Sequence, residues 1–249
     1  MSSSTVLHMS TTDGLERVAD AQGDPSDPSA LLFHGGGQTR HAWGGALGAL
    51  ASRHWYAASF DLPGHGDSAW LPDGNYDIDR FARAVADVAN QFHHPVLVGA
   101  SLGGLSSLVA VGEGMVLDPA ALVLVDVTPR LEREGVTRIG DFMRIGSDIV
   151  DGVTPGTGDG DLGEATAGRF SPPLRLHAAS RRVKVPTLLV RGGSSDVVSA
   201  EGAAELRQLI PHAEIVDVAG AEHMVAGDRN DRFNDAVIEF LERVVRGGG

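Results

Sequence analysis

The stretch that decides the fold is Pro95-Val96-Leu97-Val98-Gly99-Ala100-Ser101-Leu102-Gly103-Gly104. Its opening apolar run is typical of a strand buried on both faces of a sheet, and a helix is expected to begin at the serine. Larger side chains at Gly99 and Gly103 would collide across so sharp a bend, which explains the glycines. The bend also aims the amide groups at the start of the helix toward the target of the serine. We therefore predict that Ser101 is a nucleophile.

Short apolar runs on both sides of this turn predict further strands. They occupy residues 30–33, 55–60, 120–125, 185–190 and 213–218, and Asp13-Gly14 joins residues 5–9 and 15–19 in a hairpin. Segments with helical periodicity alternate with them at residues 77–92, 199–210 and 231–245. This order predicts an α/β fold with a mostly parallel central sheet of about eight strands and helices on both faces. In such sheets ligands bind beyond the carboxyl ends of the strands.

Two further residues are expected to activate the serine, because a serine hydroxyl is a weak nucleophile near neutral pH. His223 directly follows the last expected strand, and the ordinary pKa of histidine, ~6.5, lets it accept and return a proton. Asp196 follows the preceding strand in a glycine-rich loop and is the expected acid that orients the histidine, although it also suits a helix cap. Asp126, which ends the strand after the nucleophile, is the rival acid.

A second glycine-rich turn ends the run Leu31-Leu32-Phe33-His34-Gly35-Gly36-Gly37. Three glycines let the backbone approach a reacting carbonyl closely and present an amide to its oxygen as that oxygen becomes negative. We predict an oxyanion hole formed by the amides of Gly36 and Leu102, and a structural role for His34.

Together with Phe60-Asp61-Leu62-Pro63-Gly64-His65-Gly66-Asp67-Ser68, the chain order of serine, aspartate and histidine resembles the α/β-hydrolase superfamily over residues 5–245. The likeness is to its compact esterase, perhydrolase and metal-free haloperoxidase-like members. It implies a lid inserted after the sixth strand, no metal and no organic cofactor. The chain departs from many relatives in having Glu222 directly before the histidine, a charge that raises the histidine pKa if it lies close. Branches with an aspartate nucleophile are disfavoured because the turn carries a serine.

Residues 130–182 interrupt the alternation of strands and helices. Their middle, residues 151–161, is crowded with glycine and aspartate, which is typical of a flexible excursion. The functional interpretation makes the whole insert a short lid within a single domain spanning residues 1–249. We predict that substrate contacts come from the lid and the strand-end loops, namely from Trp43, Phe142, Met143, Val197 and Met224.

Composition excludes several classes of protein. The 33 acidic and 20 basic residues give a net charge of -13, which argues against nucleic acid or an anionic membrane as the main partner. No apolar run approaches the ~18 residues of a membrane helix, and the N-terminus has no secretory pattern, so we expect a cytoplasmic protein. The chain has no cysteine and hence no disulfide or thiolate chemistry. The oligomeric state is left open.

These residues predict transfer of an acyl group from a small ester-like molecule to water, a carboxylic ester hydrolase reaction. Two alternatives remain. The same three residues also suit a carbon–carbon bond, a lactone or a thioester, and a hydrolase-like binding protein would hold a small ligand with little turnover.

Overall fold

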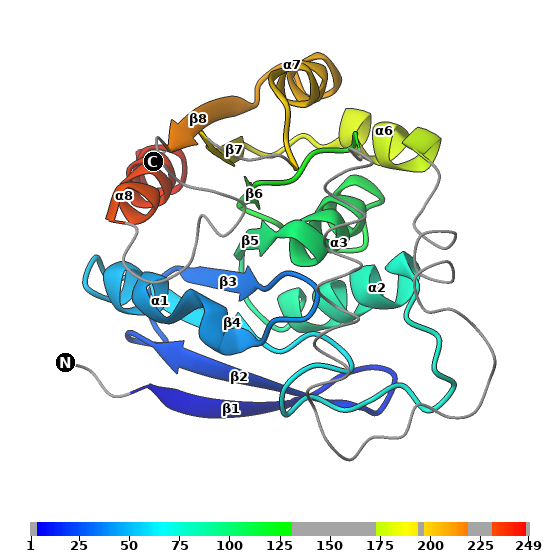
Figure 1. Cartoon of the computed structure of the whole chain (residues 1–249). Helices are drawn as coiled ribbons and strands as arrows, with labels where there is room; N and C mark the ends of the chain where they lie inside the picture. Colours follow the sequence, from blue (N-terminus) through cyan, green and yellow to red (C-terminus); the bar gives the residue numbers. More distant parts are fainter. Residues whose placement is uncertain (1–3, 131–172, 194–196, 219–230, 248–249) are drawn as a thin grey trace.

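The computed structural model describes residues 4–130, 173–193, 197–218 and 231–247. They form an eight-stranded sheet in the order β1-β2-β4-β3-β5-β6-β7-β8 (Figure 1). The strands are β1 (Thr5–Ser10), β2 (Glu16–Gln22), β3 (Ser29–Phe33), β4 (Tyr56–Phe60), β5 (Val96–Ala100), β6 (Ala121–Val125), β7 (Thr187–Gly192) and β8 (Glu214–Val218). The pairings β1 with β2 and β2 with β4 are antiparallel and all others are parallel, which confirms the predicted sheet.

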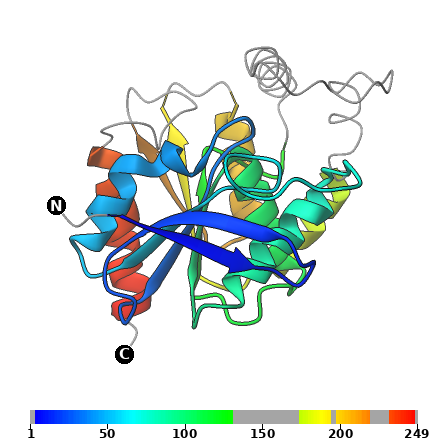
Figure 2. The same ribbon diagram turned by 90° about the horizontal axis from the view of Figure 1, so that it is seen from below.

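Helices cover both faces of the sheet (Figures 1 and 2). On one face lie α1 (Gly44–Ala51), which follows the 3-10 turn η1 (Arg40–Trp43), and α8 (Asp231–Leu241), which continues into the π-helical turn η2 (Glu242–Arg246). On the other lie α2 (Ile78–Ala89), α3 (Ser101–Gly112), α6 (Pro173–Arg182) and α7 (Ala200–Leu209). The sheet therefore separates two apolar cores, one under each helical layer.

The amphipathic pattern of α2 shows how sequence periodicity becomes packing. Ile78, Phe81 and Val85 are at most 5 % exposed and face the core, and the Asp77 carboxylate caps the helix by accepting a hydrogen bond from the Arg80 amide at 2.9 Å. No helix was expected at α1, whose sequence Gly-Gly-Ala-Leu-Gly-Ala-Leu-Ala has no polar face to reveal a period.

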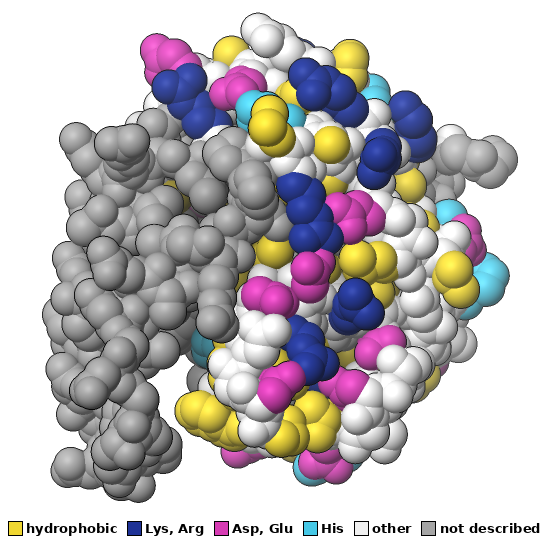
Figure 3. All heavy atoms as spheres, turned by 90° about the vertical axis from the view of Figure 1, so that its right-hand side faces the viewer, with side chains coloured by type: hydrophobic (Ala, Val, Ile, Leu, Met, Phe, Trp, Pro, Cys, Tyr) yellow, Lys and Arg dark blue, Asp and Glu magenta, His cyan; other side chains and the backbone are white. Residues whose placement is uncertain are grey.

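The expected insert, residues 130–182, divides in two. Residues 131–172 lie outside the described residues, whereas the last ten residues form α6, which packs on α3 with Leu176 and Ala179 buried. Arg175 binds Glu113 at 2.7 Å and Asp79 at 2.5 Å, tying α6 to α3 and α2. Figure 3 shows that acidic and basic side chains are interspersed over this helical face. No helix in the described ranges is long and apolar enough to cross a membrane.

The start of α3 lies directly on the end of β3. The Gly103 amide donates to the His34 carbonyl at 3.1 Å, and a Cβ on Gly103 would stand 2.2 Å from the Phe33 oxygen. A Cβ on Gly99 would stand 2.5 Å from the Gly103 oxygen. The glycines at both positions are therefore required by close backbone approach, as the sequence predicted.

Replacing Gly103 with alanine is expected to lower the free energy of unfolding by about 1–3 kcal/mol, because helix and strand must separate to admit the methyl group. The matched control is Gly44→Ala at the start of α1, where a Cβ meets nothing within 4 Å and φ is −43°. Urea denaturation of the two variants checks this. Equal stability of the two variants would contradict the packing described here.

Candidate active site

The carboxyl ends of the parallel strands meet at one edge of the sheet. Phe33 of β3 is in register with Gly99 of β5, and Ala100 of β5 with Val125 of β6. At the far side Gly192 of β7 pairs with Val218 of β8. The loop after β3, the serine turn and the segments leaving β6, β7 and β8 therefore start side by side. This edge is where chemistry is expected in an α/β sheet.

Ser101 occupies a strained backbone conformation at this edge. Its φ is 45°, the left-handed region that side-chain-bearing residues rarely adopt, and it is the first residue of α3. Such a conformation costs on the order of 1–3 kcal/mol and persists only where surrounding structure enforces it. The serine side chain is partly exposed, and its Cβ lies 3.3 Å from where a Cβ on Gly35 would stand. The structure thus brings the serine and the glycine loop together.

The glycine loop has most of its amides occupied. The Gly35 amide donates to Gln38 Oε1 at 3.0 Å, the Gly37 amide to His65 Nε2 at 3.2 Å, and the Gln38 amide to the Gly35 carbonyl at 3.2 Å. The amides of Gly36 and Leu102 have no hydrogen-bond partner among the described residues. Two unengaged donors near a serine are what an oxyanion hole requires, so the placement agrees with the prediction, and the role itself stays a prediction.

His34 and His65 lie beneath this loop with ring centroids 4.9 Å apart. His34 Nε2 accepts from the Leu62 amide at 3.0 Å, so its proton is on Nδ1, which donates to the Gly35 carbonyl at 2.7 Å. In the same way His65 Nε2 accepts from Gly37, and Nδ1 donates to the Pro63 carbonyl at 3.0 Å. Both hydrogen-bond patterns require neutral rings.

The electrostatics keep these rings neutral. Burial, and next the proximity of His65, lower the pKa of His34 to about 4. Burial also lowers the pKa of His65, against the opposing effects of the Pro63 carbonyl and the Asp61 carboxylate. An uncharged pair lets the Leu62 and Gly37 amides donate to nitrogen lone pairs.

A buried ionic cluster joins η1, which follows the glycine loop, to the loop after β4. Asp61, 1 % exposed, accepts from the Arg40 amide at 2.7 Å and from the Asp67 amide at 3.0 Å, and it forms an ion pair with the Arg40 guanidinium. Arg40 also binds Asp20 at 3.1 Å and Asp67 at 2.8 Å. Burial opposes the charge of Arg40, but the hydrogen bonds to three aspartates raise its pKa above the usual value. Sequence reasoning missed Arg40, because only the folded chain brings residues 20, 40, 61 and 67 together.

Asp126 lies beside the serine turn and is fully buried with φ of 47°. Its amide donates to the Val190 carbonyl at 2.8 Å, and its Oδ1 accepts from the Gly192 amide at 3.1 Å. The carboxylate therefore bridges the ends of β6 and β7.

Asp196 and His223 lie outside the described residues, as do Phe142, Met143 and Met224. The strands before the predicted acid and base, β7 and β8, both end at the serine edge, where the Gly193 amide donates to the Val218 carbonyl at 2.9 Å. Val197 is partly buried against the core under α2, α3 and α7.

The structure places Trp43 away from any open surface. Its side chain is 1 % exposed in the core under α1 and α8, with its ring 6.2 Å from that of Phe233. This position gives Trp43 a packing role, and a contact with substrate stays a prediction that this packing does not support.

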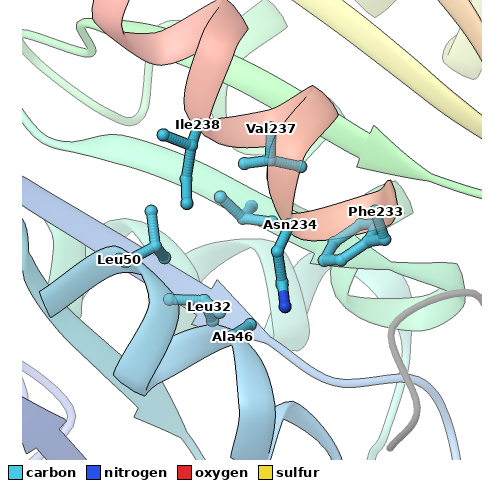
Figure 4. A pocket seen from close by; sticks show the side chains of 8 residues that line it. Leu32, Ala46, Leu50, Phe233, Asn234, Val237 and Ile238 are labelled. Atoms are coloured by element: carbon cyan, nitrogen blue, oxygen red, sulfur yellow. The ribbon is translucent and has the colours of Figure 1, made fainter. Parts of the chain in front are cut away.

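A small apolar cavity lies between α1 and α8, lined by Leu32, Ala46, Leu50, Val98, Phe233, Asn234, Val237 and Ile238 (Figure 4). Its volume of about 10 Å³ is room for about one water molecule, too little for a substrate. No group of three His, Asp or Glu side chains in the described ranges is arranged to hold a metal ion.

The strand order, the strained serine and the adjacent glycine loop define the class: an α/β protein whose candidate chemistry lies at the carboxyl edge of a mostly parallel sheet. The chain belongs to the alpha/beta hydrolase family, whose sequence profile matches residues 30–236.

Similar proteins agree with this assignment. The chain is 30 % identical to the esterase Rv0045c of Mycobacterium tuberculosis, over 88 % of this chain and 83 % of that protein. It is 27 % identical to the 2-(acetamidomethylene)succinate hydrolase of Mesorhizobium japonicum, over 87 % of this chain and 89 % of that one. The crystal structure of an E-2-(acetamidomethylene)succinate hydrolase superposes with a TM-score of 0.79 at 24 % identity, covering 96 % of this chain and all (100 %) of that one. Relatives that are hydrolases support a hydrolase activity for this chain.

The low pKa of His34 predicts a pH-dependent stability. An unfolded histidine, with pKa 6.5, takes up a proton before the folded one does, with pKa of about 4. The contribution of His34 is therefore fully present above pH 6.5 and is lost as the pH falls toward 4. The free energy of unfolding should drop by about 2 kcal/mol from this residue between pH 7 and pH 5.

Urea denaturation at pH 7, 6 and 5 measures this drop in the wild type and in His34→Gln, for which the curve should be flatter. Carboxylates with lowered pKa, such as Asp79 and Glu113, lose their contribution only below their unfolded values of 3.8 and 4.5, outside this window. Parallel pH dependences in the two proteins would show that His34 is not the group responsible.

Proposed function

We propose that the protein hydrolyses a small ester through an acyl-enzyme formed on Ser101. The observation that carries the proposal is the pairing of a serine at φ of 45° with a glycine loop whose Gly36 amide has no partner in the part of the chain that the structure describes. Strain at a partly exposed serine, and nearby amides that have no partner among the described residues, suit attack on a carbonyl. The esterase similar to this chain over most of its length supports an ester as the substrate.

In the proposed mechanism Ser101 Oγ attacks the ester carbonyl carbon while His223 accepts its proton. Asp196 holds the resulting imidazolium, and the amides of Gly36 and Leu102 donate to the carbonyl oxygen as it becomes an oxyanion. The ester carbon–oxygen bond then breaks, and His223 returns the proton to the departing alcohol. Water, deprotonated by His223, attacks the acyl-enzyme, and the same steps in reverse order release the acid and restore Ser101.

Replacing Ser101 with alanine should lower kcat for a p-nitrophenyl ester by about 10⁴-fold or more, because no other group forms the acyl-enzyme. A fluorophosphonate probe should label the wild type at Ser101 and leave the alanine variant unlabelled, as peptide mass spectrometry would show. The variant should fold with an unchanged circular dichroism spectrum, since alanine keeps the Cβ of serine and removes only a partly exposed hydroxyl. Full activity in Ser101→Ala overturns the proposal.

The identity of the acid is tested by two parallel substitutions, Asp196→Asn and Asp126→Asn. Loss of the orienting carboxylate costs ~10⁴-fold in kcat in a known serine hydrolase, and we expect a loss of this order for Asp196→Asn. Asparagine at position 126 keeps the oxygen that accepts from Gly192, so kcat should change less than about tenfold. The opposite ranking of the two kcat values would assign the acid to Asp126.

A further inference from the structure

We propose that His34 and His65 form a positioning pair that aims the Gly36 amide at the reacting oxygen. This inference rests on the proposed function and deepens it, because it identifies what holds the oxyanion donor in place. Neither ring needs to touch the substrate. Each acts through one of the two peptide groups that flank Gly36.

The first peptide group joins Gly35 to Gly36. A peptide group is planar and trans, so the Gly36 N–H points opposite to the Gly35 carbonyl within one rigid plane. That carbonyl accepts from His34 Nδ1 at 2.7 Å and from the Gln38 amide at 3.2 Å. Holding the oxygen on one side of the plane therefore fixes the direction of the N–H on the other side.

The second peptide group joins Gly36 to Gly37. Its N–H donates to His65 Nε2 at 3.2 Å, and Gly37 is itself in the left-handed region with φ of 71°. Without side chains, the three glycines have little intrinsic preference for this conformation. With both planes held, the φ and ψ of Gly36 are set from outside the loop.

The two rings are in turn held by groups that do not belong to the loop. His34 is fixed by the Leu62 amide, and His65 by the Pro63 carbonyl, by contact with the ring of His34 and by the ring of Phe81 from α2, with centroids 6.4 Å apart. The loop after β4 thus supplies a rigid support for the loop after β3. Among the described residues, the charged group that acts on both histidines is the Asp61 carboxylate, which is itself paired with Arg40.

The test uses His65, because its two hydrogen bonds can be removed with the ring shape retained. His65→Phe keeps a flat ring against His34 and Phe81 but has no acceptor for the Gly37 amide. His65→Gln is the matched control, because glutamine Oε1 is the same number of bonds from Cβ as histidine Nε2 and can accept in its place.

With a p-nitrophenyl ester, kcat should fall about 10- to 100-fold in His65→Phe, a part of the loss typical for removing an oxyanion donor, while KM stays within about threefold. His65→Gln should recover most of kcat. A trifluoromethyl ketone, whose adduct with the serine carries an oxyanion, should lose affinity for the phenylalanine variant in proportion to kcat/KM. A merely structural role would lower the amount of folded enzyme and leave kcat per labelled Ser101 unchanged.

A second measurement needs only the wild type and His65→Gln. Below the pKa of the base, kcat/KM of the wild type should depend on one more proton than kcat/KM of His65→Gln, because His65 is protonated only in the wild type, whereas His34 titrates in both proteins. Equal kcat in all three proteins, or identical pH profiles, would overturn the positioning role. Failure of the proposed function is distinguishable, since the wild type would then neither turn over the ester nor react with a fluorophosphonate at Ser101.

Discussion

The contact on which the candidate site depends is the approach of the α3 amino end to the end of β3. The Gly103 amide donates to the His34 carbonyl, and the Phe33 oxygen occupies the space in which any Cβ on Gly103 would stand. This contact joins two parts of the chain that are 69 residues apart in sequence (103 minus 34). This contact holds the serine turn and the glycine loop together. Ser101 therefore lies next to Gly35.

Around this contact, hydrogen bonds from two neutral histidines and a buried ionic cluster stabilise different segments of the chain. The Asp61 and Arg40 ion pair fixes where the loop after β4 begins and where η1 begins, and Asp20 and Asp67 also bind the Arg40 guanidinium. The two histidines stay uncharged and hold the glycine loop. In the described residues, the Gly36 amide has no hydrogen-bond partner and therefore stays available as a donor beside Ser101. Electrostatic stabilisation is most effective when the donors need no reorganisation during the reaction.

The sequence was informative where local chemistry decides the structure and uninformative where tertiary contacts decide it. The serine turn could be predicted because Gly99, Ser101 and Gly103 have a spacing with one steric explanation, and the hairpin because Gly14 needs a positive φ, observed at 75°. Helix α1 could not, because an all-apolar segment has no period. The bond from Gly37 to His65 joins residues 28 apart, and no local pattern specifies it. The sequence predicts Trp43 as a substrate contact in a strand-end loop, because its place in the core depends on packing against Phe233, which is distant in sequence.

Asp126 holds the ends of β6 and β7 together at the serine edge. Its left-handed backbone, like that of Ser101 one strand away, is a local cost that a purely structural strand end does not need. In return, its amide and carboxylate bind Val190 and Gly192 of β7, so the separation of β6 and β7 is fixed where β7 ends. Its side chain is fully buried. Asp126 therefore fixes the end of β7, the strand that precedes the predicted acid Asp196, relative to the serine.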